Sequence, residues 1–144
     1  KAPRPIVKIY SQAYLKQLNT IGDHIRKKRL DMGLSLRQVA KQIGVNKYTI
    51  IGWEKHGWVP YLHRIPKIIE FLGYIPPTIT KDMSLGGKIM AYRKITGTLQ
   101  SQLARQLGVD ASVLRKWERN KSVLQQKRFQ EAIDSLLRNG NMST

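Results

Sequence analysis

The side chains of this chain that could do chemistry are mostly cationic. Lysine and arginine number 26 against 9 acidic residues, giving a formal net charge of +17. The three histidines, His24, His56 and His63, show no metal-ligand spacing with carboxylates, and there is no cysteine. No glycine-rich phosphate loop follows a strand-like segment. The sequence therefore predicts ionic binding of a polyanion, with nucleic acid as the default, and predicts no catalysis, metal site or cofactor.

The elements that carry these charges recur along the chain. Residues 21–54 and 85–118 align without a gap at an offset of 64 residues. The identical pairs are Gly22/Gly86, Ile25/Ile89, Arg29/Arg93, Gly33/Gly97, Gln38/Gln102, Ala40/Ala104, Gln42/Gln106, Gly44/Gly108, Val45/Val109, Trp53/Trp117 and Glu54/Glu118. Such a self-repeat predicts two copies of one small structural unit.

Each copy reads as a series of short helices. In the first copy, Thr20 is a candidate cap for a helix over about 20–32, whose apolar positions are Ile21, Ile25 and Leu30. A second helix follows the capping box of Ser35 and Gln38 and ends at Gly44. A third, capped by Asn46, runs from Lys47 to about Lys55, and a fourth covers roughly 65–72. We expect the core to contain Val39, Ile50, Trp53, Leu103, Leu114 and Trp117.

A helix, a tight glycine turn and a second helix form the geometry that places one helix in the DNA major groove. The stretches LSLRQVAKQIGVNKYTIIGWE and TLQSQLARQLGVDASVLRKWE resemble the phage-repressor and Cro-like (lambda-repressor-like) helix-turn-helix family. The likeness rests on the glycine turn, the alanine, the capped helix and the terminal Trp-Glu, and covers nearly all of residues 20–138. It implies a small all-helical domain that reads DNA through its third helix.

The resemblance also implies roles for individual residues. The matching base-contact positions are Lys47, Tyr48, Ile51, Gly52, Ala111, Ser112, Arg115 and Lys116. Gln100 matches a family glutamine that contacts a phosphate, whereas the first copy has Leu36 there; in the second copy Leu99 occupies the cap position, leaving Thr98 as a poorer cap. The family's ion pair between the first and third helices matches Arg29 with Glu54 and Arg93 with Glu118.

The chemistry of these side chains separates the two copies. Arg115 suits the O6 and N7 atoms of guanine, and Ile51 suits a thymine methyl group. Gly52 offers no side chain, so the first copy is open to two other interpretations, a protein-contact domain or a phosphate clamp. The further phosphate contacts that we predict are Ser35, Arg37, Arg64, Lys127 and Arg128.

We therefore predict an all-α protein of two tandem lambda-repressor-like helix-turn-helix domains joined by a Pro-containing linker. The predicted parts are a basic arm or leader over 1–20, domain 1 over 21–74, an extended linker over 75–84, domain 2 over 85–138 and a frayed tail over 139–144. No apolar run reaches the roughly 18 residues of a membrane span, and a cytoplasmic, nucleoid-associated location is expected.

The predicted function is sequence-specific binding of double-stranded DNA by a transcriptional regulator. Because the two third helices differ, we expect an asymmetric two-part site that is read through the major groove. One alternative is a DNA-targeting subunit of a recombination, transposition or other nucleoprotein machine, and another is an antitoxin or adaptor-type protein-interaction module. A homodimer and a larger nucleoprotein complex are both compatible with the sequence.

Overall fold

Side-chain caps and left-handed glycines set the helix bounds. The hydroxyls of Thr20 and Ser35 accept hydrogen bonds from the backbone N–H groups of Asp23 and Gln38, and the Asn46 side chain accepts one from Thr49 N–H. Each of these bonds satisfies a donor that the first helical turn leaves free. Gly44 ends its helix with φ of 88°, a conformation that glycine adopts without steric cost. The caps and the stop predicted from the sequence are therefore confirmed.

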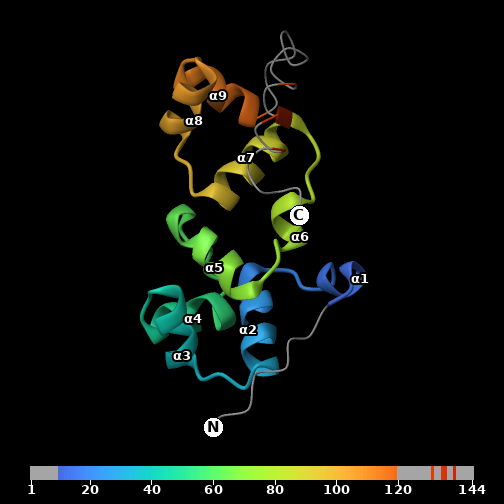
Figure 1. Ribbon diagram of the computed structural model, residues 1–144, viewed down its shortest axis with the longest axis vertical. Helices are drawn as coiled ribbons and strands as arrows, with labels where there is room; N and C mark the ends of the chain where they lie inside the picture. Colours follow the sequence, from blue (N-terminus) through green and yellow to red (C-terminus); the bar gives the residue numbers. More distant parts are fainter. Residues whose placement is uncertain (1–9, 120–130, 132–133, 136–137, 139–144) are drawn as a thin grey trace. The chain divides into compact units, whose positions relative to one another are not determined.

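The computed structural model describes residues 10–119, 131, 134–135 and 138, and the elements in that part of the chain are all helical (Figure 1). The all-α prediction is confirmed for these residues. The elements are α1 (Gln12–Leu15), α2 (Ile21–Asp31), α3 (Leu36–Ile43), α4 (Lys47–Lys55), the 3₁₀ turn η1 (Leu62–Arg64), α5 (Ile65–Leu72), α6 (Pro77–Thr80), α7 (Leu85–Thr96), α8 (Gln100–Leu107) and α9 (Ala111–Glu118).

The chain divides into two compact units, Lys1–Thr78 and Ile79–Thr144. In the first unit α2 and α3 both pack on α4, and α5 packs on α2 and α3 (Figure 1). The small Ala40 lies in this core, where α3 and α4 meet. The buried core residues are Ile25, Val39, Ala40, Ile43, Ile50, Trp53, Ile68 and Leu72.

The second unit has its own core, in which α7 and α8 pack on α9. Its buried members are Leu85, Ile89, Tyr92, Leu103, Ala104, Leu114 and Trp117. Five of them lie 64 residues after core residues of the first unit: Ile89, Leu103, Ala104, Leu114 and Trp117. The sequence repeat therefore corresponds to equivalent core positions in the two units, and all six core residues predicted from the sequence are buried.

Helix α2 departs from its predicted pattern. Leu30 is 53% exposed, because a step of five residues from Ile25 takes it away from the buried face. His24, in contrast, is buried, and its Nδ1 lies 2.8 Å from the Tyr74 hydroxyl. The other ring nitrogen, Nε2, is buried without a hydrogen-bond partner. A histidine therefore occupies a position that apolar periodicity alone does not reveal.

This burial predicts that acid weakens the first unit. Desolvation lowers the pKa of His24 below its ordinary value of 6.5, although Asp23 opposes the shift. The unfolded chain then takes up a proton at a pH where the folded chain does not, so the free energy of unfolding should fall as pH drops through 6.5. Denaturation at a series of pH values checks this. An equally steep pH dependence in His24→Gln would contradict it.

One segment outside the helical repeats also differs from expectation. The linker predicted to be extended contains α6, which begins at Pro77, a residue whose fixed φ suits a first helical turn. In the predicted arm, α1 buries Leu15, and the Tyr10 hydroxyl donates a hydrogen bond to Asp31. The predicted tail over 139–144 lies outside the described residues.

Candidate nucleic-acid interface

Helices α3 and α4 and the turn between them form the first candidate interface. An open hollow of about 360 Å³ lies there, lined by Arg37, Ala40, Lys41, Val45, Asn46, Lys47 and Tyr48. The Tyr48 side chain is 69% exposed, and Lys47 Nζ lies 5.3 Å from the centre of its ring. Ile51 is half-buried. Three of the four base-contact positions predicted on α4 therefore have side chains at least partly accessible to solvent.

Gly52, the fourth predicted position on α4, is buried under Trp58. A Cβ atom at Gly52 would lie 1.9 Å from the Trp58 ring, and the backbone N–H of Trp58 donates to the Gly52 carbonyl at 3.1 Å. A base contact by Gly52 does not agree with this packing. Because Gly52 has no side chain, the Trp58 ring can pack against its backbone. No local spacing rule predicts this contact from the sequence.

The predicted phosphate contacts of the first unit lie at the start of α3 and beside the α3–α4 turn. The Ser35 hydroxyl caps α3 and retains its own hydrogen as a donor. Arg37 is exposed on the first turn of α3. Arg64, at the end of η1, donates from Nη1 to the Gly44 carbonyl at 3.1 Å, which holds its guanidinium beside the turn.

An ion pair fixes α2 against α4. Arg29 donates from Nε and Nη2 to the two Glu54 oxygens at 2.9 and 2.8 Å, and from Nη1 to the Leu34 carbonyl at 3.3 Å. The side chain of Glu54 is only 1% exposed. The hydrogen bond to Glu54 raises the pKa of Arg29, which burial opposes. Such a bidentate pair fixes the direction in which α4 presents its outer face.

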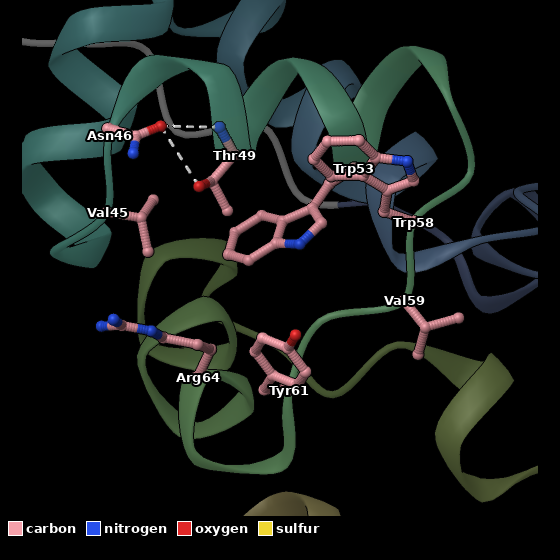
Figure 2. A pocket seen from close by; sticks show the side chains of 8 residues that line it. All are labelled: Val45, Asn46, Thr49, Trp53, Trp58, Val59, Tyr61 and Arg64. Atoms are coloured by element: carbon pink, nitrogen blue, oxygen red, sulfur yellow. Dashed lines mark hydrogen bonds between the residues drawn. The ribbon is translucent and has the colours of Figure 1, made fainter.

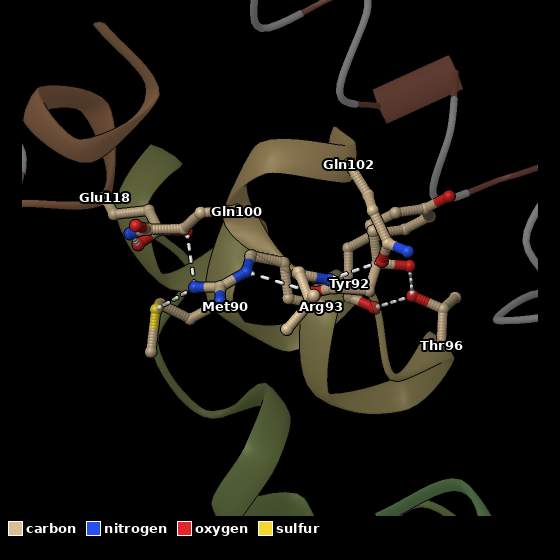
Figure 3. Close-up of polar contacts among 9 residues, drawn as sticks. Met90, Tyr92, Arg93, Thr96, Gln100, Gln102 and Glu118 are labelled. Carbon is tan, nitrogen blue, oxygen red and sulfur yellow. Dashed lines mark hydrogen bonds and ion pairs between the residues drawn. The ribbon is translucent and has the colours of Figure 1, made fainter. Parts of the chain in front are cut away.

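The second unit has a related network with one addition (Figure 3). Arg93 donates from Nη1 to Glu118 at 2.9 Å and from Nε to the Thr98 carbonyl at 3.1 Å. Gln100 donates from its amide to the other Glu118 oxygen. An amide has two N–H groups, so this hydrogen bond leaves the second N–H of Gln100 unused. The first unit has Leu36 at this position, and there Arg29 takes both carboxylate oxygens.

The start of α8 lacks a side-chain cap. Leu99 occupies the cap position, and the Gln102 side chain accepts its backbone N–H at 2.9 Å. The Thr98 hydroxyl lies 2.6 Å from that of Thr96 and does not cap the helix, so the substitute cap predicted at Thr98 is wrong.

Helix α9 presents the basic face of the second unit. Arg115 and Lys116 are exposed, as is Ser112, whose hydroxyl donates to Asp110 at 3.1 Å. Ala111 is half-buried. The predicted phosphate contacts Lys127 and Arg128 lie outside the described residues. Beyond α9 and Arg119, the structure describes Glu131, Asp134, Ser135 and Arg138, all of them helical.

Two exposed basic residues were not predicted from the sequence as part of the interface. Lys41 on α3 and Arg105 on α8 lie 64 residues apart, each in the last turn of its helix. Lys41 lines the hollow between α3 and α4. Their shared charge type at the repeat offset was the available signal. A search for identical residue pairs does not reveal this pair, because lysine and arginine are different residues that carry the same charge.

The described residues were also compared with the requirements of a metal site and of a membrane-spanning helix. That part of the chain contains no group of three or more His, Cys, Asp or Glu side chains placed to hold a metal ion. None of its helices combines the length and the apolar character that a membrane crossing needs.

Comparison with known proteins finds a match for one part of the chain. Residues 89–136 match the family model described as helix-turn-helix. The match includes most of α7, all of α8 and α9, and the segment beyond them. No curated protein and no solved structure matches the chain. The described chain is thus all-helical, and its second unit contains a helix-turn-helix domain.

Proposed function

We propose that this protein binds double-stranded DNA sequence-specifically and regulates transcription. The observation that carries the proposal is the helix-turn-helix match over residues 89–136, whose last fully described helix, α9, exposes Arg115 and Lys116. In this motif the second helix lies in the major groove and its side chains meet base edges. Arg115 is the proposed guanine reader, because a guanidinium can donate to O6 and N7 together.

Phosphate contacts supply most of the affinity in this proposal. The net charge of +17 favours association with a polyanion, and Gln100 keeps one amide hydrogen for a phosphate oxygen. Ser35, Arg37 and Arg64 are the corresponding proposed contacts of the first unit. Such contacts position the protein without reading sequence.

We propose further that the first unit is a second reading domain. Its support is the 64-residue repeat together with the equivalent core positions and the matching ion pair. In it, Lys47, Tyr48 and Ile51 are the proposed base contacts; Gly52 is left out because Trp58 covers it. Since α4 and α9 expose different side chains, the preferred site has two unlike parts. In this role the protein acts on the nucleoid in the cytoplasm.

Selection of bound duplexes from a random DNA pool tests the proposal on the full chain. We expect an enriched site with two unlike parts and an affinity that falls steeply with added salt, because bound phosphates release counterions. Enrichment of one short block alone would contradict the two-part site. Failure to retain any duplex in dilute buffer would contradict DNA binding itself.

Substitution of Arg115 distinguishes a contact that reads a base from one that only binds a phosphate. Arg115→Ala should lower affinity for the selected site by about 1–3 kcal/mol and relax base preference at one position. Lys127→Ala, the proposed phosphate contact, should weaken selected and scrambled duplexes alike. Titration of both variants against both duplexes is the measurement. An equal loss on the two duplexes for Arg115→Ala would refute its role as a reader.

A further inference from the structure

The loop after α4 exposes an unusual amount of apolar surface. We define the aromatic loop as residues 57–61, Gly-Trp-Val-Pro-Tyr. In it Trp58 is 57% exposed, Val59 79% and Tyr61 78%. Large apolar side chains grouped this way on a surface mark interaction sites, whereas scattered ones carry no such meaning.

The aromatic loop is held in place by specific contacts. The Trp58 ring packs on the Gly52 backbone, where any side chain would collide with it. The Tyr61 ring stacks on His63, with centroids 6.1 Å apart and planes 10° from parallel. An exposed surface that is fixed in this way costs little conformational entropy when a partner binds.

Trp58 and Tyr61 have no aromatic counterpart in the second copy of the repeat, whereas Val59 corresponds to Val123. At the offset of 64, Gly52 is replaced by Lys116. Trp58 and Tyr61 are replaced by Ser122 and Gln125. The glycine and the tryptophan that needs it thus occur together in one copy and are both absent from the other. Common DNA chemistry of two copies does not account for aromatic residues that one copy lacks.

A cavity opens beside the aromatic loop. It measures about 490 Å³ and is lined by Val45, Asn46, Thr49, Trp53, Trp58, Val59, Tyr61 and Arg64 (Figure 2). Asn46 turns its side-chain oxygen to the backbone and hydroxyl of Thr49, at 2.9 and 3.2 Å. The remaining lining offers aromatic and aliphatic surface with one guanidinium, a composition that suits an apolar anchor flanked by a negative charge.

The charges around this cavity are basic. None of its eight lining residues is acidic, and the neighbouring exposed Lys55 adds a positive charge to that of Arg64. The nearby carboxylate of Glu54 is buried and paired with Arg29. A partner that brings its own carboxylates is therefore complementary to this surface.

We propose that the aromatic loop and the adjoining cavity dock an acidic segment of a partner protein, which inserts one apolar side chain into the cavity. This inference goes beyond DNA binding and does not rest on it, although Arg64, a proposed phosphate contact, belongs to both surfaces. Duplex DNA fits the surface less well, because its phosphates gain nothing from the isopropyl group of Val59 or the hydrocarbon face of Trp58. An apolar anchor gains from both, and the carboxylates beside it meet Arg64 and the basic rim.

A displayed library of random peptides, selected on the full chain, tests the proposal. We expect enriched peptides to share an apolar residue flanked by Asp or Glu. Their synthetic versions should bind the Val59→Ser/Tyr61→Ser double variant about tenfold or more weakly, as measured by fluorescence anisotropy. Both side chains are more than three-quarters exposed, so the variant should keep the helical signal and melting temperature of the parent.

Leu30→Ser is the matched control. It removes another exposed apolar side chain from the same unit, on α2, and should leave peptide affinity unchanged. The proposal is overturned if no peptide is enriched, if the enriched peptides lack acidic residues, or if the double variant binds them as well as the parent does. It is also overturned if the double variant loses duplex affinity instead, or if its only defect is the loss of a dimer of this chain.

Discussion

Replacing Glu54 with alanine should lower the free energy of unfolding of the first unit by about 3–5 kcal/mol, because the change leaves a buried guanidinium without its partner. Arg29 is 15% exposed and gives two hydrogen bonds to this carboxylate. Solvent can therefore replace little of what the substitution removes. Denaturant titration of the full chain, followed by the helical signal, measures the loss.

Two further variants make this result interpretable. Glu70→Ala removes a carboxylate that is 73% exposed and paired with Lys67, and it should change stability by less than about 1 kcal/mol. A double-mutant cycle with Arg29→Met and Glu54→Ala then isolates the pair. Additive effects in that cycle would show that the 2.8 Å contact contributes no coupling, contrary to this expectation.

Gly22→Ala should destabilise the same unit by about 3 kcal/mol, at the upper end of the range for overpacking. A Cβ atom at Gly22 would lie 1.7 Å from the backbone oxygen of Trp53, and a backbone atom cannot turn aside as a flexible side chain can. Alanine would otherwise stabilise a helix by about 1 kcal/mol relative to glycine, so the collision must dominate. Thermal unfolding of the variant checks the sign.

Arg26→Ala provides the comparison for Gly22→Ala. Arg26 is exposed one helical turn further along α2, so its replacement should leave the melting temperature nearly unchanged. If Gly22→Ala melted at or above the temperature of the parent, the close approach of α2 to the end of α4 would be disproved.

Local sequence signals predicted the helices and their ends well. Ser35, Gln38 and Gly44 bound α3 as the capping box and the glycine indicate, and the repeat placed Trp53 and Trp117 in their cores. These features depend on residues close in the chain or on apolar periodicity. The described helices of both units therefore follow largely from the sequence.

Contacts set by loop conformation could not be predicted in this way. Trp58 reaches back over Gly52 because residues 56–58 turn, and no periodic rule fixes that turn. Gln100 donates a hydrogen bond to Glu118, which is possible because Arg93 donates to only one of the two Glu118 oxygens. His24 is buried because Tyr74, fifty residues away, supplies a polar partner. The unpredicted parts of the candidate site are thus tertiary in origin.

Because each unit contains its own core, damage to one need not spread to the other. A substitution on the outside of α4 leaves the apolar interior around Trp117 untouched. Such independence allows substitutions that change the surface of one unit to accumulate while the core of the other unit stays intact. The unlike outer faces of α4 and α9, over interiors that remain alike, are what that freedom would produce.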